Sequence, residues 1–153
     1  MNNHIAIDGP AGAGKSTIAK AVAKKKGLIY VDTGAMYRAL GLYLIREHID
    51  VNDTAAVIAA CERADVNIVY ENKEQVVLLN GENVNGLIRT EAVGNMASAC
   101  SAIARVREIM VERQQKLAKE KDVVMDGRDI CSVVLPDART KIYMTASSAV
   151  RAK

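Results

Sequence analysis

A glycine-rich segment near the N-terminus has the residue types and spacing of a phosphate-binding site. Residues 9–16 read Gly-Pro-Ala-Gly-Ala-Gly-Lys-Ser and fit the pattern G-x-x-x-x-G-K-[ST]. Glycines let backbone N–H groups approach phosphate oxygens, and the N-terminus of a following helix adds a partial positive charge. In such a loop Lys15 reaches the β- and γ-phosphates of a nucleoside triphosphate, and the Ser16 hydroxyl binds Mg²⁺. The residues predicted to bind ATP phosphates are Gly9, Pro10, Ala11, Gly12, Ala13, Gly14, Lys15, Ser16 and Thr17.

Two further segments combine arginine with aspartate, each directly after a short apolar run. Residues 32–38 read Asp-Thr-Gly-Ala-Met-Tyr-Arg, and residues 126–129 read Asp-Gly-Arg-Asp. Ligands of open parallel sheets bind beyond the carboxyl ends of the strands, so we expect both segments to face the glycine-rich loop across one cleft. The guanidinium groups of Arg38 and Arg128 suit bidentate contact with phosphate. The alternative for both arginines is an ordinary surface ion pair.

The elements that must position these residues alternate between strand and helix. Short apolar runs bounded by turn residues indicate buried strands, and apolar residues three and four positions apart indicate helices. The predicted order is strand 4–8, helix 14–26, strand 28–31 and helix 34–48, with strands 123–125 and 142–145 completing the core. This order predicts an α/β fold with a parallel sheet and flanking helices, as in P-loop NTPases.

The middle of the chain has a different pattern. Residues 66–70 and 75–79 are two β-rich runs around a short polar break, which predicts an antiparallel hairpin. A long helix is expected from residue 91 to about residue 120. We therefore expect a single domain over residues 1–153 with an inserted lobe at about residues 51–95.

Composition excludes several classes of protein. Half of the 153 residues are hydrophobic and 25% are charged, as in ordinary globular domains. The chain has five Tyr but no Phe or Trp, and its net charge of +3 is not concentrated in a basic cluster, which argues against a nucleic-acid partner. Three cysteines without metal-binding spacing favour free thiols in a reducing compartment. With no apolar run of roughly 18 residues and no leader pattern, we expect a cytoplasmic monomer without a membrane partner.

These motifs together resemble those of bacterial cytidylate kinases, in order and in spacing. The resemblance covers nearly the whole chain. Its segments are the glycine-rich loop, residues 32–38, Ile-Arg-Thr at 88–90, Arg-Val-Arg-Glu at 105–108 and Val-Met-Asp-Gly-Arg-Asp-Ile at 124–130. The inserted lobe also resembles the enlarged monophosphate-binding region of the bacterial enzymes. The resemblance implies an ATP-dependent kinase of pyrimidine nucleotide metabolism that phosphorylates CMP or dCMP.

The resemblance also implies roles for individual residues. Lys15 and Arg128 are then catalytic, and Asp126 assists Ser16 in holding Mg²⁺ through a water molecule. The acceptor is bound by Thr33, Arg38, Ser98, Arg107, Arg128 and Asp129, with the two arginines Arg38 and Arg128 on its phosphate. Ser98, Arg107 and Asp129 read the cytosine edge, whose N4 amino group donates and whose N3 accepts a hydrogen bond.

The chain departs from the family pattern at two places. Cys131-Ser132 stands where the family commonly has Gly-Thr, and a side chain in a left-handed conformation there would cost about 1–2 kcal/mol. The chain ends at Lys153, where the family continues into an arginine-bearing lid, and loss of a lid would slow turnover. Two alternatives therefore stay open: a kinase for another acceptor, such as UMP, AMP or shikimate, and a catalytically incomplete nucleotide-binding fragment.

Overall fold

The computed structural model describes residues 3–10, 13–71, 74–127 and 129–145. The chain forms two compact units: the first combines Met1–Thr33 with Gln114–Lys153, and the second is Gly34–Arg113. In the described part of the chain, no helix is long and apolar enough to cross a membrane. The predicted organisation, one kinase domain with an acceptor-binding insertion, stays a prediction.

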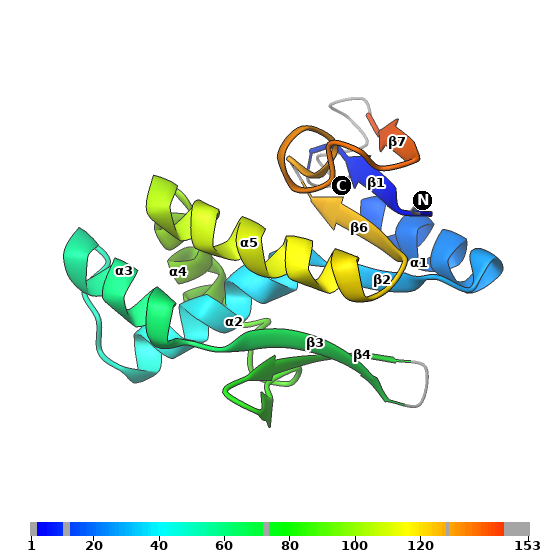
Figure 1. The fold of residues 1–153 in the computed structure, drawn as a ribbon. Coiled ribbons are helices and arrows are strands. Elements are labelled where there is room, and N and C mark those ends of the chain that lie inside the picture. Colours follow the sequence, from blue (N-terminus) through cyan, green and yellow to red (C-terminus); the bar gives the residue numbers. More distant parts are fainter. Residues whose placement is uncertain (1–2, 11–12, 72–73, 128, 146–153) are drawn as a thin grey trace. The chain divides into compact units, whose positions relative to one another are not determined.

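The first unit contains a parallel sheet with the strand order β2-β6-β1-β7 (Figure 1). Its strands are β1 (Ile5–Asp8), β2 (Ile29–Asp32), β6 (Val123–Gly127) and β7 (Thr140–Tyr143). This confirms the predicted α/β class and its parallel sheet. The last strand begins and ends two residues before the predicted 142–145, because Thr140 already pairs with Ile5 and its N–H donates to the carbonyl oxygen of His4.

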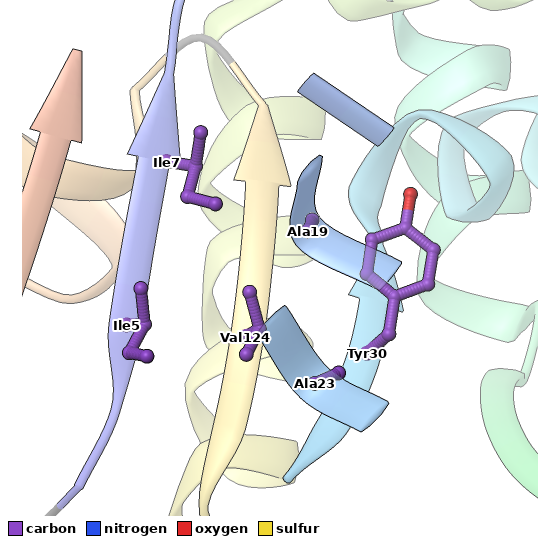
Figure 2. Close-up of a cluster of buried hydrophobic side chains, with 6 residues drawn as sticks. All are labelled: Ile5, Ile7, Ala19, Ala23, Tyr30 and Val124. Carbon is purple, nitrogen blue, oxygen red and sulfur yellow. The ribbon is translucent and has the colours of Figure 1, made fainter. Parts of the chain in front are cut away.

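Helix α1 (Lys15–Lys26) packs on one face of this sheet. Because side chains alternate along a strand, Ile5 and Ile7 of β1 point to the same face as Val124, where they meet Ala19 and Ala23 of the helix (Figure 2). The small alanine side chains let the helix lie close to the strands. This packing fixes the N-terminus of α1 at the carboxyl end of β1.

A π-helical turn, η1 (Ile130–Val134), follows β6 and was not expected from the sequence. Asp8 holds its start, because the Asp8 carboxylate accepts hydrogen bonds from the N–H groups of Ile130 (2.8 Å) and Cys131 (2.9 Å). Among the described residues other than glycine, only His48 and Asn80 have a positive φ. Cys131 therefore carries no left-handed strain at the position where the family commonly has glycine.

The second unit holds helices around a three-stranded antiparallel sheet. The hairpin of β3 (Val66–Glu71) and β4 (Glu74–Leu79) confirms the predicted one, and β5 (Glu82–Asn83) adds a third strand. Helix α2 (Thr33–Arg46) starts one residue before the unit and leads into it. The sequence prediction missed α3 (Thr54–Arg63), although Asp53 provides an N-cap by accepting a hydrogen bond from the N–H of Ala56.

The single long helix predicted from residue 91 to about 120 is wrong. The structure has α4 (Glu91–Ser101) and α5 (Ala104–Glu120), separated by two residues. The N–H of Ile103 bonds to the carbonyl of Cys100, a tighter turn than the α-helical one, and the Ser101 hydroxyl donates to the Ser98 carbonyl. Apolar periodicity runs through this break, so periodicity alone could not reveal it.

Candidate functional site

The glycine-rich loop has the backbone geometry that its sequence predicts. Gly9 has φ +151°, and a Cβ there would overlap the backbone carbonyl of Met144. Gly14 lies in the left-handed region with φ +84° and caps the start of α1 without a side-chain hydrogen bond. Both positions require glycine, because other residues rarely adopt such angles. Ala11 and Gly12 of the predicted loop lie outside the described residues.

Lys15 folds back over this loop from the first turn of α1. Its Nζ donates to the carbonyl oxygen of Gly9 and lies 3.4 Å from that of Pro10. The side chains of Ser16 and Thr17 are exposed on the same turn, which contains no acidic residue. The turn therefore offers a lysine ammonium, two hydroxyl groups and helix N-terminal N–H groups, a combination that suits an anion.

Asp126, at the carboxyl end of β6, supplies a buried carboxylate to the first unit. Its Oδ2 accepts a hydrogen bond of 2.9 Å from the Tyr30 hydroxyl. Its pKa is raised to about 6, chiefly by burial and next by the charge of Asp32, while Tyr30, Lys15 and Lys20 act in the opposite direction. The predicted role of Asp126 in holding Mg²⁺ stays a prediction.

Tyr30 and Lys20 are functional candidates that the sequence analysis missed. The Lys20 Nζ lies over the Tyr30 ring, 5.8 Å from its centre. The hydroxyl of the same tyrosine donates to Asp126. The sequence indicates part of this arrangement, because Tyr30 and Asp32 are two residues apart on one strand and so point to the same face of the sheet. The tyrosine's partner on another strand, 96 residues away, could not be inferred from that alternation.

Thr33 lies at the carboxyl end of β2 with only 5% of its surface exposed. Its hydroxyl donates to the backbone carbonyl of Asp126 at 2.7 Å. A Cβ at Gly127 would lie 2.7 Å from the Thr33 Oγ1 and 3.0 Å from Ile130, so glycine is needed there to admit this contact. The predicted contact of Thr33 with the acceptor stays a prediction, and its donated hydrogen is used within the fold.

Asp129 is the N-cap residue that precedes the η1 turn, and its side chain is half-buried. Its carbonyl accepts hydrogen bonds from the N–H groups of Val133 (2.9 Å) and Val134 (3.3 Å). The η1 turn thereby fixes the backbone of the residue predicted to read cytosine. Arg128, predicted to be catalytic, lies outside the described residues.

The remaining predicted acceptor residues belong to the second unit. Arg38 on α2 is half-buried, and its Nη1 donates to the carbonyl oxygen of Ile88 at 3.2 Å. Ser98 is exposed on α4, and Arg107 is exposed on α5. The structure thus groups Lys15, Thr33, Asp126 and Asp129 in the first unit and Arg38, Ser98 and Arg107 in the second. The predicted single cleft that unites the two groups stays a prediction.

A parallel sheet whose first strand leads through G-x-x-x-x-G-K-S into a helix defines the P-loop class of nucleotide-binding α/β proteins. Comparison with known proteins gives the family. The family model described as "Cytidylate kinase" matches residues 5–153. The chain belongs to the cytidylate kinase family, which confirms the resemblance found in its motifs.

Curated relatives agree with this assignment. The chain is 51% identical to "Cytidylate kinase" of Caldicellulosiruptor saccharolyticus over 98% of its own length and 66% of the relative's. It is 52% identical to "Cytidylate kinase" of Desulforamulus reducens over 100% of its own length and 69% of the relative's. The corresponding protein of Bacillus velezensis is 50% identical over 97% of this chain and 66% of its own length. The chain therefore spans about two thirds of the length of these relatives.

Proposed function

We propose that this chain transfers the γ-phosphoryl group of ATP to CMP or dCMP, producing ADP and CDP or dCDP. Membership of the cytidylate kinase family supports this proposal. The structural observation that carries it is the first turn of α1, where Lys15 lies against the loop carbonyls and the hydroxyl groups of Ser16 and Thr17 are exposed. Phosphoryl transfer depends mainly on positioning and on neutralising phosphate charge, and this turn provides groups for both.

On the donor side, Lys15 leaves the loop carbonyls and binds the β- and γ-phosphates of ATP. The backbone N–H groups of residues 9–17, other than Pro10, which has none, bind the remaining phosphate oxygens. The exposed Ser16 hydroxyl and the Asp126 carboxylate are hard oxygen ligands of the kind that Mg²⁺ prefers, with Asp126 acting through water. The bound ion would neutralise charge on the phosphates.

On the acceptor side, Arg38 and Arg128 bind the phosphate of CMP, and Thr33 contacts its phosphate or sugar. Arg38 is suited to this role because, among the described residues, no carboxylate lies within ion-pair distance of its guanidinium. Ser98, Arg107 and Asp129 read the cytosine edge. A site that leaves buried polar groups unpaired against uracil discriminates strongly between the two bases.

The experiment that tests the function is an ADP-release assay with the 153-residue chain, ATP·Mg²⁺ and CMP, UMP or AMP. Turnover that prefers CMP supports the proposal. Turnover that prefers UMP or AMP would show that this nucleotide, and not CMP, is the acceptor. A further assay with shikimate tests an acceptor that has no base. Binding of CMP in a calorimetric titration without turnover would favour the nucleotide-binding alternative.

The division of roles predicts the effect of Lys15→Ala. Removing the ammonium leaves phosphate charge unneutralised, so we expect kcat/KM to fall by roughly 100-fold or more. ATP affinity should fall while the Kd for CMP changes by less than about twofold, since CMP contacts other residues. Titration calorimetry with each nucleotide measures both values, and Lys24→Ala at the far end of α1 is the matched control. Unchanged ATP affinity in Lys15→Ala would contradict the assignment of the donor site.

A further inference from the structure

Two glycines mark the place where α2 and α4 approach each other in the second unit. A Cβ at Gly41 would lie 3.0 Å from the Ala97 nitrogen and 3.0 Å from the Val93 carbonyl oxygen. These are backbone atoms that cannot rotate away, so the two helices are as close as their backbones allow. The α2 residue one turn before this contact is Arg38, which shares a helix face with Gly41.

The guanidinium of Arg38 lies directly against the backbone of α4 at Gly94. A Cβ at Gly94 would be 3.3 Å from the Arg38 Nη1 and 3.7 Å from both Cζ and Nη2. The same Nη1 donates to the Ile88 carbonyl oxygen at 3.2 Å. The guanidinium thus contacts the helix backbone at Gly94 and one carbonyl group, and the Arg38 side chain is half-buried.

This arrangement fixes the direction of the arginine without neutralising it. A carbonyl oxygen uses one of the five guanidinium N–H groups and brings no formal negative charge. Among the residues that the structure describes, no acidic side chain pairs with Arg38. A pre-oriented and unpaired guanidinium is suited to bind an anion, because little side-chain entropy remains to be lost on binding.

We propose that Gly94 is a positioning residue that sets the Arg38 guanidinium for the phosphate of the acceptor nucleotide. This inference rests on the proposed function. Ser98 lies four residues after Gly94 and therefore on the same face of α4, which places the predicted cytosine contact one turn from the guanidinium. One face of α4 then positions the arginine that binds the phosphate and also contacts the base of the acceptor.

The variant Gly94→Ala separates this role from a role in stability. Alanine favours helix more than glycine does, so the variant should melt at the temperature of the parent chain or above it. The added methyl group nevertheless pushes the guanidinium by a few tenths of an ångström and strains its 3.2 Å bond to Ile88. We expect the Kd for CMP to rise about five- to tenfold and that for cytidine, which has no phosphate, to rise less than about twofold.

Two controls show whether the effect passes through Arg38. Gly86→Ala is the matched glycine variant, since nothing lies within 4 Å of a Cβ there and its φ is not positive. It should bind CMP like the parent chain. In the Arg38→Ala background, where CMP binding is already weak, Gly94→Ala should cause no additional loss. A further loss in the double variant would show that Gly94 acts by another route and would overturn the proposal.

The outcomes also distinguish this proposal from the proposed function. If the parent chain binds CMP and Gly94→Ala binds it equally well, the positioning role is wrong and the function stands. If the parent chain binds no CMP, the acceptor assignment fails. The ¹⁵N NMR signal of the Arg38 guanidinium then still tests the contact, since it should shift in Gly94→Ala and stay in place in Gly86→Ala; an unchanged signal in Gly94→Ala contradicts the contact.

Discussion

Asp126 shows how a single residue of the site can work against the stability of the fold. The residue is 5% exposed, and burial together with the charge of Asp32 raises the pKa of its carboxyl from an ordinary 3.8 to about 6. The folded chain therefore holds this proton more tightly than the unfolded chain does. Ionisation of Asp126 costs no stability below about pH 4, and the full cost is present above about pH 6.

This cost predicts a stabilising substitution. Asp126→Asn keeps an oxygen to accept the Tyr30 hydrogen bond but carries no charge, so it should raise the free energy of unfolding by on the order of 2 kcal/mol at pH 7.5. The gain should shrink as the pH falls from 6 towards 4, because Asp126 of the folded chain is then protonated and no buried charge remains to be removed. Urea unfolding of both chains at pH 7.5, 6 and 5 measures it. Activity should fall, because Asp126 is proposed to assist Mg²⁺ binding.

The matched control for Asp126→Asn is Glu112→Gln, which makes the same carboxylate-to-amide change at an exposed position. It should leave the unfolding free energy within about 0.5 kcal/mol of the parent at every pH. A destabilised Asp126→Asn chain at pH 7.5 would show that the buried carboxylate is stabilised by its partners instead, and a gain independent of pH would show that ionisation of Asp126 is not its cause.

At the scale of elements, η1 depends on Asp8 of β1. Two backbone N–H groups, those of Ile130 and Cys131, donate to this one carboxylate, which is itself buried. Hydrogen bonds to a charged acceptor are stronger than neutral ones, and a buried donor without an acceptor costs the full desolvation penalty. The carboxylate therefore stabilises the start of the turn that follows Asp129.

We expect Asp8→Ala to lower the free energy of unfolding by about 2–4 kcal/mol, because both N–H groups lose their acceptor. Asp8→Asn should cost less, since its single amide oxygen still accepts one of the two bonds. Chemical denaturation of the three chains gives the order parent, Asp8→Asn, Asp8→Ala. Equal costs for the two variants would show that charge, and not the number of acceptors, holds η1.

The sequence predicted most elements whose signal is local, although it missed α3 despite the local N-cap of Asp53, and it missed the turn that depends on a distant partner. Buried strands and the hairpin were found because apolar runs bounded by turn residues identify them. The π-helical turn was missed because its start is held by Asp8, which lies 122 residues away. In the candidate site, the glycine-rich loop and Arg38 were recognisable from their motifs. The support of Arg38 by Gly94 was not, because it arises only when two helices pack.

At the scale of the whole molecule, the proposed donor residues all belong to one unit, whereas the proposed acceptor residues are divided between the two. Lys15, Ser16 and Asp126 belong to the first unit, whereas Arg38 and Ser98 belong to the second. Thr33, Arg128 and Asp129 extend the acceptor set into the first unit's part of the sequence. Binding of ATP should therefore be detectable at Lys15 and Ser16, and binding of CMP at Arg38 and Ser98, whatever the arrangement of the units.

Hydrogen exchange can detect this division. ATP·Mg²⁺ should slow exchange at short times in peptides that cover residues 13–17, and CMP should slow it in peptides that cover residues 88–98, because bound ligands suppress local opening. Reciprocal variants sharpen the test: Lys15→Ala should lose the ATP effect and keep the CMP effect, and Arg38→Ala should do the reverse. Mass spectrometry of the exchanged peptides measures both. If CMP protects residues 13–17 and leaves residues 88–98 unchanged, the monophosphate occupies the glycine-rich loop, and the assignment of donor and acceptor must be abandoned.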